Sequence, residues 1–257
     1  MHPLKGNEPM LFTSKATSHG VSEHHFTLDD IPGVLWSPPG SPDGRPVILL
    51  IHGGGQHKTA PAMLGRVGQV TARGFAAISL DAPGAGDRPK TPRDEQFVAE
   101  LRQRMAAGEP VGHEVAKYNA EVAVRAVPEW RAVLNALRAD GQVAGDALVG
   151  VWGMSLGAAI GVPLAAAEPR INAAVLGLAS HDTLVEAAAQ VTVPVQFLLQ
   201  WDDQLVPRDE ALALFDAFAS PAKTLHANPG PHAAVPAFEW DSAAEFLARH
   251  LSPRPAR

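Results

Sequence analysis

The chain has no cysteine among its 257 residues. This absence excludes disulfide bonds, thiolate metal sites and a cysteine nucleophile. The sequence also lacks a run of about 18 apolar residues, the length that a helix needs to cross a membrane. Residues 1–20 lack the continuous apolar stretch of a signal peptide. We therefore expect no membrane partner and a cytoplasmic location.

Basic residues are too few for a nucleic-acid-binding surface. The chain has 21 Lys and Arg against 27 Asp and Glu, and its net charge is −6, so we expect no nucleic-acid partner. Hydrophobic residues make up 46% and charged residues 19% of the chain. These proportions allow a large core and exclude extensive disorder. The composition leaves the oligomeric state open.

Apolar runs alternate with helical patterns along most of the chain. Residues 46–52 (PVILLIH) are typical of a strand that is buried on both faces of a parallel sheet. We expect strands at residues 21–28, 31–38, 46–52, 75–80, 147–152, 171–178, 193–200 and 223–227. We expect helices at residues 61–73, 93–107, 115–139, 156–167, 182–190, 208–218 and 239–251. This alternation predicts an α/β fold, with a mostly parallel sheet covered by helices on both faces.

One long segment interrupts this alternation. Residues 82–146 separate two expected strands, and a single crossover helix needs a much shorter segment. We interpret residues 88–127 as a helical insertion that could form a small lid. We interpret residues 128–139, which start at Pro128, as the crossover helix. The alternative is a surface helical hairpin with no role in substrate binding. Either arrangement keeps residues 1–257 in a single domain.

Residues 153–157 (GMSLG) form the one G-x-S-x-G motif in the chain. An apolar strand precedes the motif and a helix of small residues follows it. This is the strand–turn–helix context of a nucleophilic serine, and the flanking glycines relieve steric clashes at a strained turn. The motif indicates Ser155 as a nucleophile. The alternative is a serine that only caps the following helix.

A serine hydroxyl needs a general base, and the base needs a carboxylate that orients it. Of the 11 histidines, His232 follows the last expected strand and precedes the last helix, where a loop can reach over the sheet. His226 lies within that strand. Two carboxylates, Asp202 and Asp203, follow the strand at 193–200, and both could reach the base. We favour His232 and Asp203.

The negative charge that develops on the substrate oxygen needs backbone N–H donors. Leu156 follows the serine directly and supplies one donor, and Gly54 or Gly55 in the loop 52–56 (HGGGQ) supplies the other. We expect His52 to hold this loop rather than to transfer protons. His52 and His57 lack metal-ligand spacing. The sequence thus predicts neither a metal site nor a cofactor.

These motifs together resemble the α/β-hydrolase superfamily, in the branch of dienelactone-hydrolase-like and prolyl-oligopeptidase-like esterases. The resemblance spans residues 21–251 and rests on HGGGQ at 52–56, DAPGAG at 81–86, GMSLG at 153–157, DQLVP at 203–207 and GPH at 230–232. It implies that Asp203 is the acid of a Ser-His-Asp triad and that Asp81 steadies a loop. Dienelactone hydrolases proper use a cysteine nucleophile, so a general esterase is expected here.

Two functions of different classes fit these residues. The first is a serine hydrolase that cleaves a small-molecule carboxylic ester, thioester or lactone through an acyl-serine intermediate. The second is a non-catalytic or single-turnover protein that keeps the same fold as a ligand pocket. The adjacent Ser180, His181 and Asp182 cannot converge on one point, although His181 follows a strand end and could line the pocket.

Overall fold

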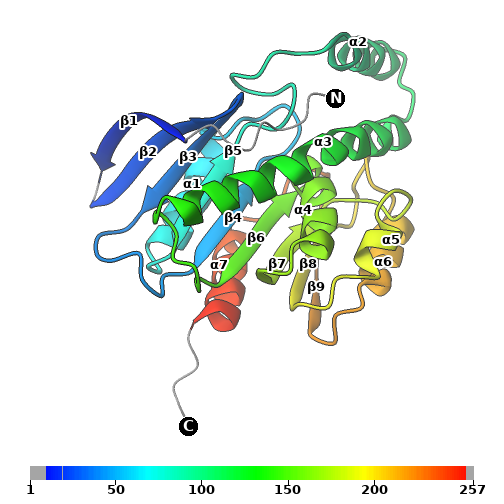
Figure 1. Ribbon diagram of the computed structural model, residues 1–257. Helices are drawn as coiled ribbons and strands as arrows, with labels where there is room; N and C mark the ends of the chain where they lie inside the picture. Colours follow the sequence, from blue (N-terminus) through cyan, green and yellow to red (C-terminus); the bar gives the residue numbers. More distant parts are fainter. Residues whose placement is uncertain (1–9, 19, 253–257) are drawn as a thin grey trace.

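The computed structural model describes residues 10–18 and 20–252. Within these residues, nine strands form one sheet in the order β1-β2-β3-β5-β4-β6-β7-β8-β9 (Figure 1). The pairs β1-β2, β2-β3 and β3-β5 are antiparallel, and the pairs from β5-β4 to β8-β9 are parallel. The α/β fold with a mostly parallel sheet is therefore confirmed.

The bounds of most elements agree with the expected ranges to within a few residues. The strands are β1 (Leu11–Ser18), β2 (Val21–Leu28), β3 (Ile31–Ser37), β4 (Val47–Ile51), β5 (Ala76–Leu80), β6 (Val149–Met154), β7 (Ile171–Gly177), β8 (Val195–Gln200) and β9 (Lys223–Asn228). The helices are α1 (Pro61–Thr71), α2 (Pro92–Ala106), α3 (Gly112–Ala139), α4 (Leu156–Ala167), α5 (Val185–Ala188), α6 (Arg208–Ala217) and α7 (Phe238–Leu251).

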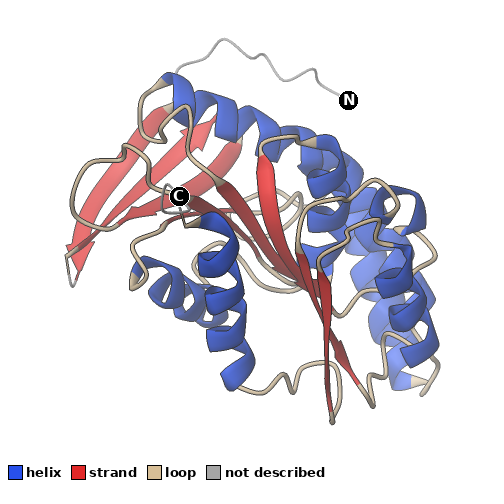
Figure 2. Ribbon diagram, turned by 90° about the horizontal axis from the view of Figure 1, so that it is seen from below, coloured by secondary structure: helices blue, strands red, loops and turns tan. Residues whose placement is uncertain are grey.

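Alternate side chains of the central strands enter two separate cores, one on each face of the sheet. In β4, Leu49 and Ile51 pack among residues of α3 and α4, whereas Ile48 and Leu50 pack among residues of α1 and α7. Figure 2 shows helices on both sides of the sheet. This double burial explains why the central strands are continuous apolar runs rather than alternating ones.

Three elements differ from the expectation. The helix expected to begin at Pro128 instead continues from Gly112 to Ala139 without a break. Pro128 removes the hydrogen bond to the carbonyl of Val124, but both residues lie on the solvent side of α3, where water can bond to that carbonyl. Buried residues on both sides, such as Ala126 and Trp130, keep the helix against the sheet.

The helix expected at 182–190 is shortened to α5, which spans Val185–Ala188 and has no side-chain cap at Leu184. The strand β1 was not expected from the sequence. All its described side chains are exposed, so it carries no apolar pattern, and its antiparallel pairing with β2 holds it in place.

No helix in the described part of the chain is both long and apolar enough to span a membrane. Part of the segment 1–20, for which we expected no signal peptide, lies outside the described residues.

Candidate active site

Ser155 lies in the sharp turn between β6 and α4 with φ of 57° and ψ of −118°. A Cβ atom on Gly153 would lie 2.1 Å from the carbonyl oxygen of Gly157, and a Cβ on Gly157 would lie 2.4 Å from that of Ile51. Side chains at these two positions would prevent this close packing. Although Ser155 precedes α4, its side chain makes no capping hydrogen bond, which disfavours the helix-cap interpretation.

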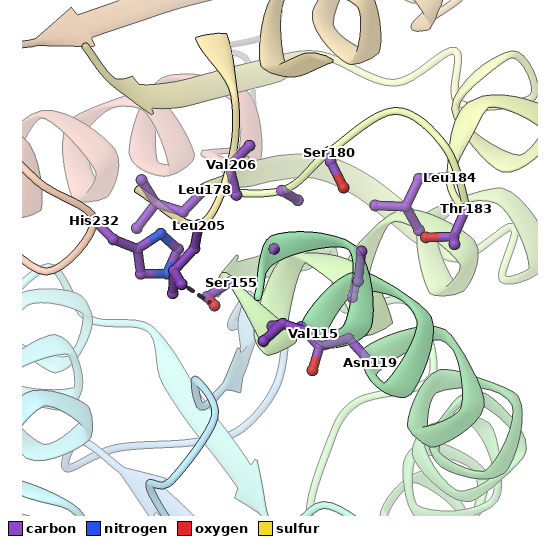
Figure 3. Close-up of a pocket in the computed structure, with 14 residues that line it drawn as sticks. Val115, Asn119, Ser155, Leu178, Ser180, Thr183, Leu184, Leu205, Val206 and His232 are labelled. Atoms are coloured by element: carbon purple, nitrogen blue, oxygen red, sulfur yellow. Dashed lines mark hydrogen bonds between the residues drawn. The ribbon is translucent and has the colours of Figure 1, made fainter. Parts of the chain in front are cut away.

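Three side chains that follow the carboxyl ends of parallel strands form a continuous series of hydrogen bonds. The Oγ of Ser155, after β6, lies 3.0 Å from Nε2 of His232, after β9. Nδ1 of His232 lies 2.7 Å from Oδ2 of Asp203, after β8. Figure 3 shows the imidazole and the hydroxyl facing each other. With the proton on Nδ1, the imidazole donates to the carboxylate and Nε2 can accept the serine proton.

The two adjacent aspartates have different partners. Oδ1 of Asp203 accepts hydrogen bonds from the N–H groups of Leu205 (2.8 Å) and Val206 (3.0 Å), which aims Oδ2 at the imidazole. The side chain of Asp203 is only 2% exposed. Asp202 is exposed, and its Oδ2 accepts from the N–H of Gly230 at 3.0 Å. The structure thus brings Asp203, and not Asp202, to His232.

Two glutamines that the sequence analysis missed hold the loop that carries His232. Oε1 of Gln204 accepts a hydrogen bond from the backbone N–H of His232 at 3.1 Å. Nε2 of Gln200 donates to the carbonyl groups of Pro229 (3.4 Å) and Pro231 (3.3 Å). Gln204 follows Asp203 directly and Gln200 precedes it by three residues. This proximity was the only signal in the sequence for their role. The loop therefore has fixed partners at His232 and in the three residues that precede it.

His52 holds the glycine loop after β4, as expected. It is fully buried, its Nδ1 donates to the carbonyl of Gly53 at 2.8 Å, and its Nε2 accepts from the N–H of Ala82 at 3.0 Å. Burial lowers the pKa of His52, and this keeps the ring neutral at physiological pH. Both ring nitrogens are occupied, so His52 connects the loops after β4 and β5 and is not free to transfer protons.

A buried ion pair joins the same two loops. Nζ of Lys58 lies 2.6 Å from Oδ2 of Asp81 and also contacts Asp87. The carboxylate of Asp81 accepts from the N–H groups of Lys58 (2.8 Å) and Asp87 (2.9 Å) as well. Burial opposes the charge on Asp81, but these hydrogen bonds outweigh it and lower its pKa. Asp81 thus steadies the loop, as the family resemblance implied.

Gly54, Gly55 and Leu156 line the same cleft as Ser155. Among the described residues, none of their three backbone N–H groups donates a hydrogen bond to another protein group. A Cβ atom on Gly54 would contact nothing within 4 Å, so the cleft is open at this point. The N–H groups are available to a substrate oxygen.

Two spaces of very different size meet at Ser155. The narrow pocket is lined by Val115, Ala159, Leu178, Ser180, Leu184 and Val206, among others. The wide cleft is lined by Gly54, Gly84, Phe97, Leu101, Tyr118 and Leu156, among others. The narrow pocket has a volume of about 20 Å³ and the wide cleft a volume of about 540 Å³. Both spaces also touch His232.

His181 is not one of the residues that line the narrow pocket, although its neighbours Ser180 and Thr183 are. The expectation that His181 could line the pocket is therefore wrong. Its backbone carbonyl instead accepts hydrogen bonds from Leu184 and Val185 at the start of α5.

Across residues 10–18 and 20–252, no group of three or more His, Asp or Glu side chains is arranged to hold a metal ion.

Comparisons with known proteins agree with this architecture. A model of the dienelactone hydrolase family matches residues 33–233. The chain is similar to a cold-adapted esterase from an Arctic intertidal metagenomic library, with 32% identity and a TM-score of 0.76 over 94% of this chain and 100% of the other. A comparison with curated proteins gave no match.

More distant structures share the fold. An acetyl xylan esterase from Paenibacillus sp. R4 is 15% identical, with a TM-score of 0.67 over 94% of this chain and 88% of that chain. An esterase from Pyrococcus furiosus is 14% identical, with a TM-score of 0.65 over 98% of this chain and 96% of that chain. The family match covers most of the chain and agrees with the resemblance noted in its motifs. The chain belongs to the dienelactone hydrolase family.

Proposed function

We propose that the protein hydrolyses carboxylic esters through an acyl-serine intermediate, with Ser155 as nucleophile, His232 as general base and Asp203 as the acid that orients the base. Family membership already makes the chain a hydrolase of the esterase type. The observation that carries the finer proposal is the hydrogen-bonded chain from Asp203 through His232 to Ser155. This series of hydrogen bonds ends at the cleft, where a substrate can reach the serine.

The reaction begins when Oγ of Ser155 attacks the carbonyl carbon of the ester. A C–O bond forms, the serine proton passes to Nε2 of His232, and the carbonyl oxygen becomes negative. The N–H groups of Leu156 and of Gly54 or Gly55 stabilise this oxygen, and loss of one such donor costs about 10²–10³ in turnover in a related type of site. The bond to the alcohol oxygen then breaks, and the alcohol leaves with the proton from His232.

A water molecule completes the cycle. His232 removes a proton from the water, and the resulting hydroxide attacks the carbonyl carbon of the acyl-serine. The bond to Oγ of Ser155 breaks, the serine regains its proton from His232, and the carboxylic acid leaves. The negative Asp203 stabilises the imidazolium that forms in both half-reactions. No metal ion or cofactor takes part in these steps, and thioesters or lactones would react in the same way.

We also propose that the insertion at 88–127 acts as a lid over the wide cleft. Three residues of α2, Phe97, Val98 and Leu101, line this cleft. The ring of Phe97 stacks on that of Tyr118 in α3, with 3.8 Å between centroids and 3° between planes. These contacts support a role in substrate binding over a surface hairpin with no such role.

The proposed substrate is a small molecule. The cytoplasmic location of the protein remains a prediction.

Covalent labelling tests the proposal against the alternative of a non-catalytic binding protein. A fluorophosphonate probe is incubated with the folded protein, and the intact mass and the modified peptide are measured. We expect one adduct, on Ser155. The variant Ser155→Ala should give no adduct, and Ser41→Ala, in a surface turn, should label like the parent. Folded parent protein that stays unlabelled and hydrolyses no ester would favour the binding protein.

A further inference from the structure

We propose that the narrow pocket holds the acyl group and restricts it to acetyl, whereas the wide cleft holds a bulky alcohol. The preferred substrates are then acetyl esters of large alcohols. This inference rests on the proposed function, because it assigns the two sides of the ester to the two spaces that meet at Ser155.

The geometry around Ser155 leaves only two directions for the substituents of the ester carbonyl. Once Oγ bonds to the carbonyl carbon, the carbonyl oxygen turns toward the N–H groups of Leu156 and of Gly54 or Gly55. The acyl chain and the alcohol oxygen remain. Both the narrow pocket and the wide cleft touch Ser155 and His232, so each space can receive one of these two substituents.

The sizes of the two spaces differ too much for two large substituents. A single water molecule needs about 10–15 Å³ of cavity volume, so the narrow pocket, with about 20 Å³, has room for one group of that size. A methyl group fits, and a longer chain does not. The wide cleft, with about 540 Å³, has room for an aromatic or sugar-sized group. One side of the ester must therefore be small.

The walls of the two spaces are compatible with an acyl group in the narrow pocket. Ala159, Leu178 and Val206 form an apolar part of this pocket, against which a methyl group can pack, beside the polar Asn119, Ser180 and Thr183. The wide cleft combines Gln56 and Lys90, which can bond to hydroxyl groups, with Phe97 and Leu101, against which an aromatic group can pack.

The order of events in the reaction points the same way. The acyl group stays bonded to Ser155 while the alcohol leaves and water enters. The alcohol therefore needs the larger exit, which is the wide cleft.

Two substrate series test the assignment on the unaltered protein. The first series is p-nitrophenyl acetate, butyrate and octanoate, which share one leaving group. We expect kcat/KM to fall at least about 100-fold from acetate to octanoate, since one methylene beyond the limit of a pocket already costs about 10-fold or more. The second series is phenyl, 1-naphthyl and 4-biphenylyl acetate, whose leaving groups have similar basicity. Here we expect kcat/KM to stay within about tenfold.

Each alternative outcome is distinct. If kcat/KM for the octanoate ester equals that for the acetate ester, the inference is overturned and the proposed function stays intact. Discrimination against the larger alcohols, together with tolerance of long acyl chains, would reverse the assignment and also overturn it. A protein that hydrolyses none of these esters and is not labelled by the fluorophosphonate would overturn the proposed function itself.

A pair of variants tests which residues set the limit. Leu184 is buried in the wall of the narrow pocket, so Leu184→Ala should raise the butyrate-to-acetate ratio of kcat/KM about tenfold. Val98 lines only the wide cleft, so Val98→Ala should alter the preference among alcohols without raising that ratio. If the butyrate-to-acetate ratio is unchanged in folded Leu184→Ala, Leu184 does not limit the length of the acyl group. If this variant does not fold, as circular dichroism would show, the substrate series still decide the proposal.

Discussion

The loops that carry the three side chains of the proposed triad and the helix α2 border the same cleft, but they are held in different ways. Each residue of the proposed triad follows a strand of the sheet, and hydrogen bonds with Gln200 and Gln204 fix the loop of His232. By contrast, the buried contacts of α2 with α3 come from its first two turns, and its last turn adds, among the described residues, only the partly exposed ion pair of Arg104 with Glu114, at 3.2 Å, beside the exposed Met105.

This difference separates the reaction from the selection of the substrate. The distances within the chain Asp203–His232–Ser155 depend on the sheet, whose central strands are buried on both faces. The width of the cleft depends on α2, which lines it with Phe97, Val98 and Leu101 and lies outside the sheet. Changes in the loops should therefore abolish turnover, whereas changes in α2 should mainly alter KM.

The largest expected effect is that of Ser155→Ala. We expect turnover to fall by about 10⁴ or more, as loss of the nucleophile does in a related type of site. The melting temperature should stay close to that of the parent, because the side chain caps no helix and the bond from the N–H of Ser155 to Gly177 is retained. Turnover within about tenfold of the parent, or a clear loss of stability with turnover kept, would instead support a structural serine.

The second prediction compares the two aspartates. In Asp203→Asn, the amide oxygen can still accept from Leu205 and Val206, but the NH₂ group then faces the imidazole. The wrong histidine tautomer is favoured, and a loss of about 10⁴ in turnover is expected. In Asp202→Asn, the oxygen that accepts from Gly230 is retained, so the loss should stay below about tenfold.

Turnover of both aspartate variants is measured with p-nitrophenyl acetate from pH 6 to 9, after circular dichroism has shown that they fold. A strong loss in Asp202→Asn together with a weak loss in Asp203→Asn would refute the assignment of the acid. A strong loss in both would mean that the loop of Gly230 is itself essential.

The sequence predicts the strands and the reactive residues for related reasons. The central strands are recognisable because burial on both faces leaves no polar position in β4, and Ser155 is recognisable because its turn requires glycine on both sides. The strand β1 has no such pattern because its side chains are exposed. The continuity of α3 through Pro128 depends on where solvent lies, which a local pattern does not contain.

The supporting residues and the shape of the cleft could not be predicted in the same way. A glutamine at the end of a strand, such as Gln200, has no motif that reveals its partner. The two spaces beside Ser155 arise where α3, α2 and several loops meet, so their sizes follow from tertiary packing. Sequence therefore predicts the reaction more readily than the substrate.

The third prediction concerns α2 and has a smaller effect. Asp94 is buried near the start of α2 and accepts hydrogen bonds from the backbone N–H of Thr91 (2.8 Å), the hydroxyl of Tyr118 (2.8 Å) and the guanidinium of Arg125 (3.1 Å). Asp94→Ala should loosen α2 because it removes these bonds. We expect KM for p-nitrophenyl acetate to rise about three- to tenfold, with kcat within about twofold of the parent. Trypsin should cleave α2 faster than in the parent.

Glu95→Ala is the matched control, because Glu95 is the exposed neighbour of Asp94 in the same turn. Burial opposes the charge of Asp94, but its hydrogen bonds outweigh burial and lower its pKa. The contribution of Asp94 is thus fully present above its ordinary pKa of 3.8 and is lost as the pH falls below that value. If Asp94→Ala lowers kcat by orders of magnitude instead, α2 is part of the reactive framework and the comparison of the two regions fails.

The smallest expected effect on turnover is that of Glu168→Gln, at the end of α4 remote from Ser155. Hydrogen bonds from Arg170 at 2.6 Å, together with Arg131, outweigh burial and lower the pKa of Glu168 from 4.5 to about 2. A lowered pKa in the folded state stabilises the fold above the unfolded pKa of about 4.5, and this contribution disappears as the pH falls to about 2. At about 1.4 kcal/mol per pKa unit, the contribution is on the order of 3 kcal/mol.

Urea denaturation of the parent and of Glu168→Gln at several pH values measures this contribution. We expect the difference in the free energy of unfolding to be largest near pH 7 and to shrink below pH 4.5, with turnover at 25 °C within about twofold of the parent because the reactive loops do not depend on this ion pair. Glu245→Gln, at an exposed position of α7, should change neither quantity. A large loss of turnover in folded Glu168→Gln would show that the position of α4, and with it the turn of Ser155, depends on its far end.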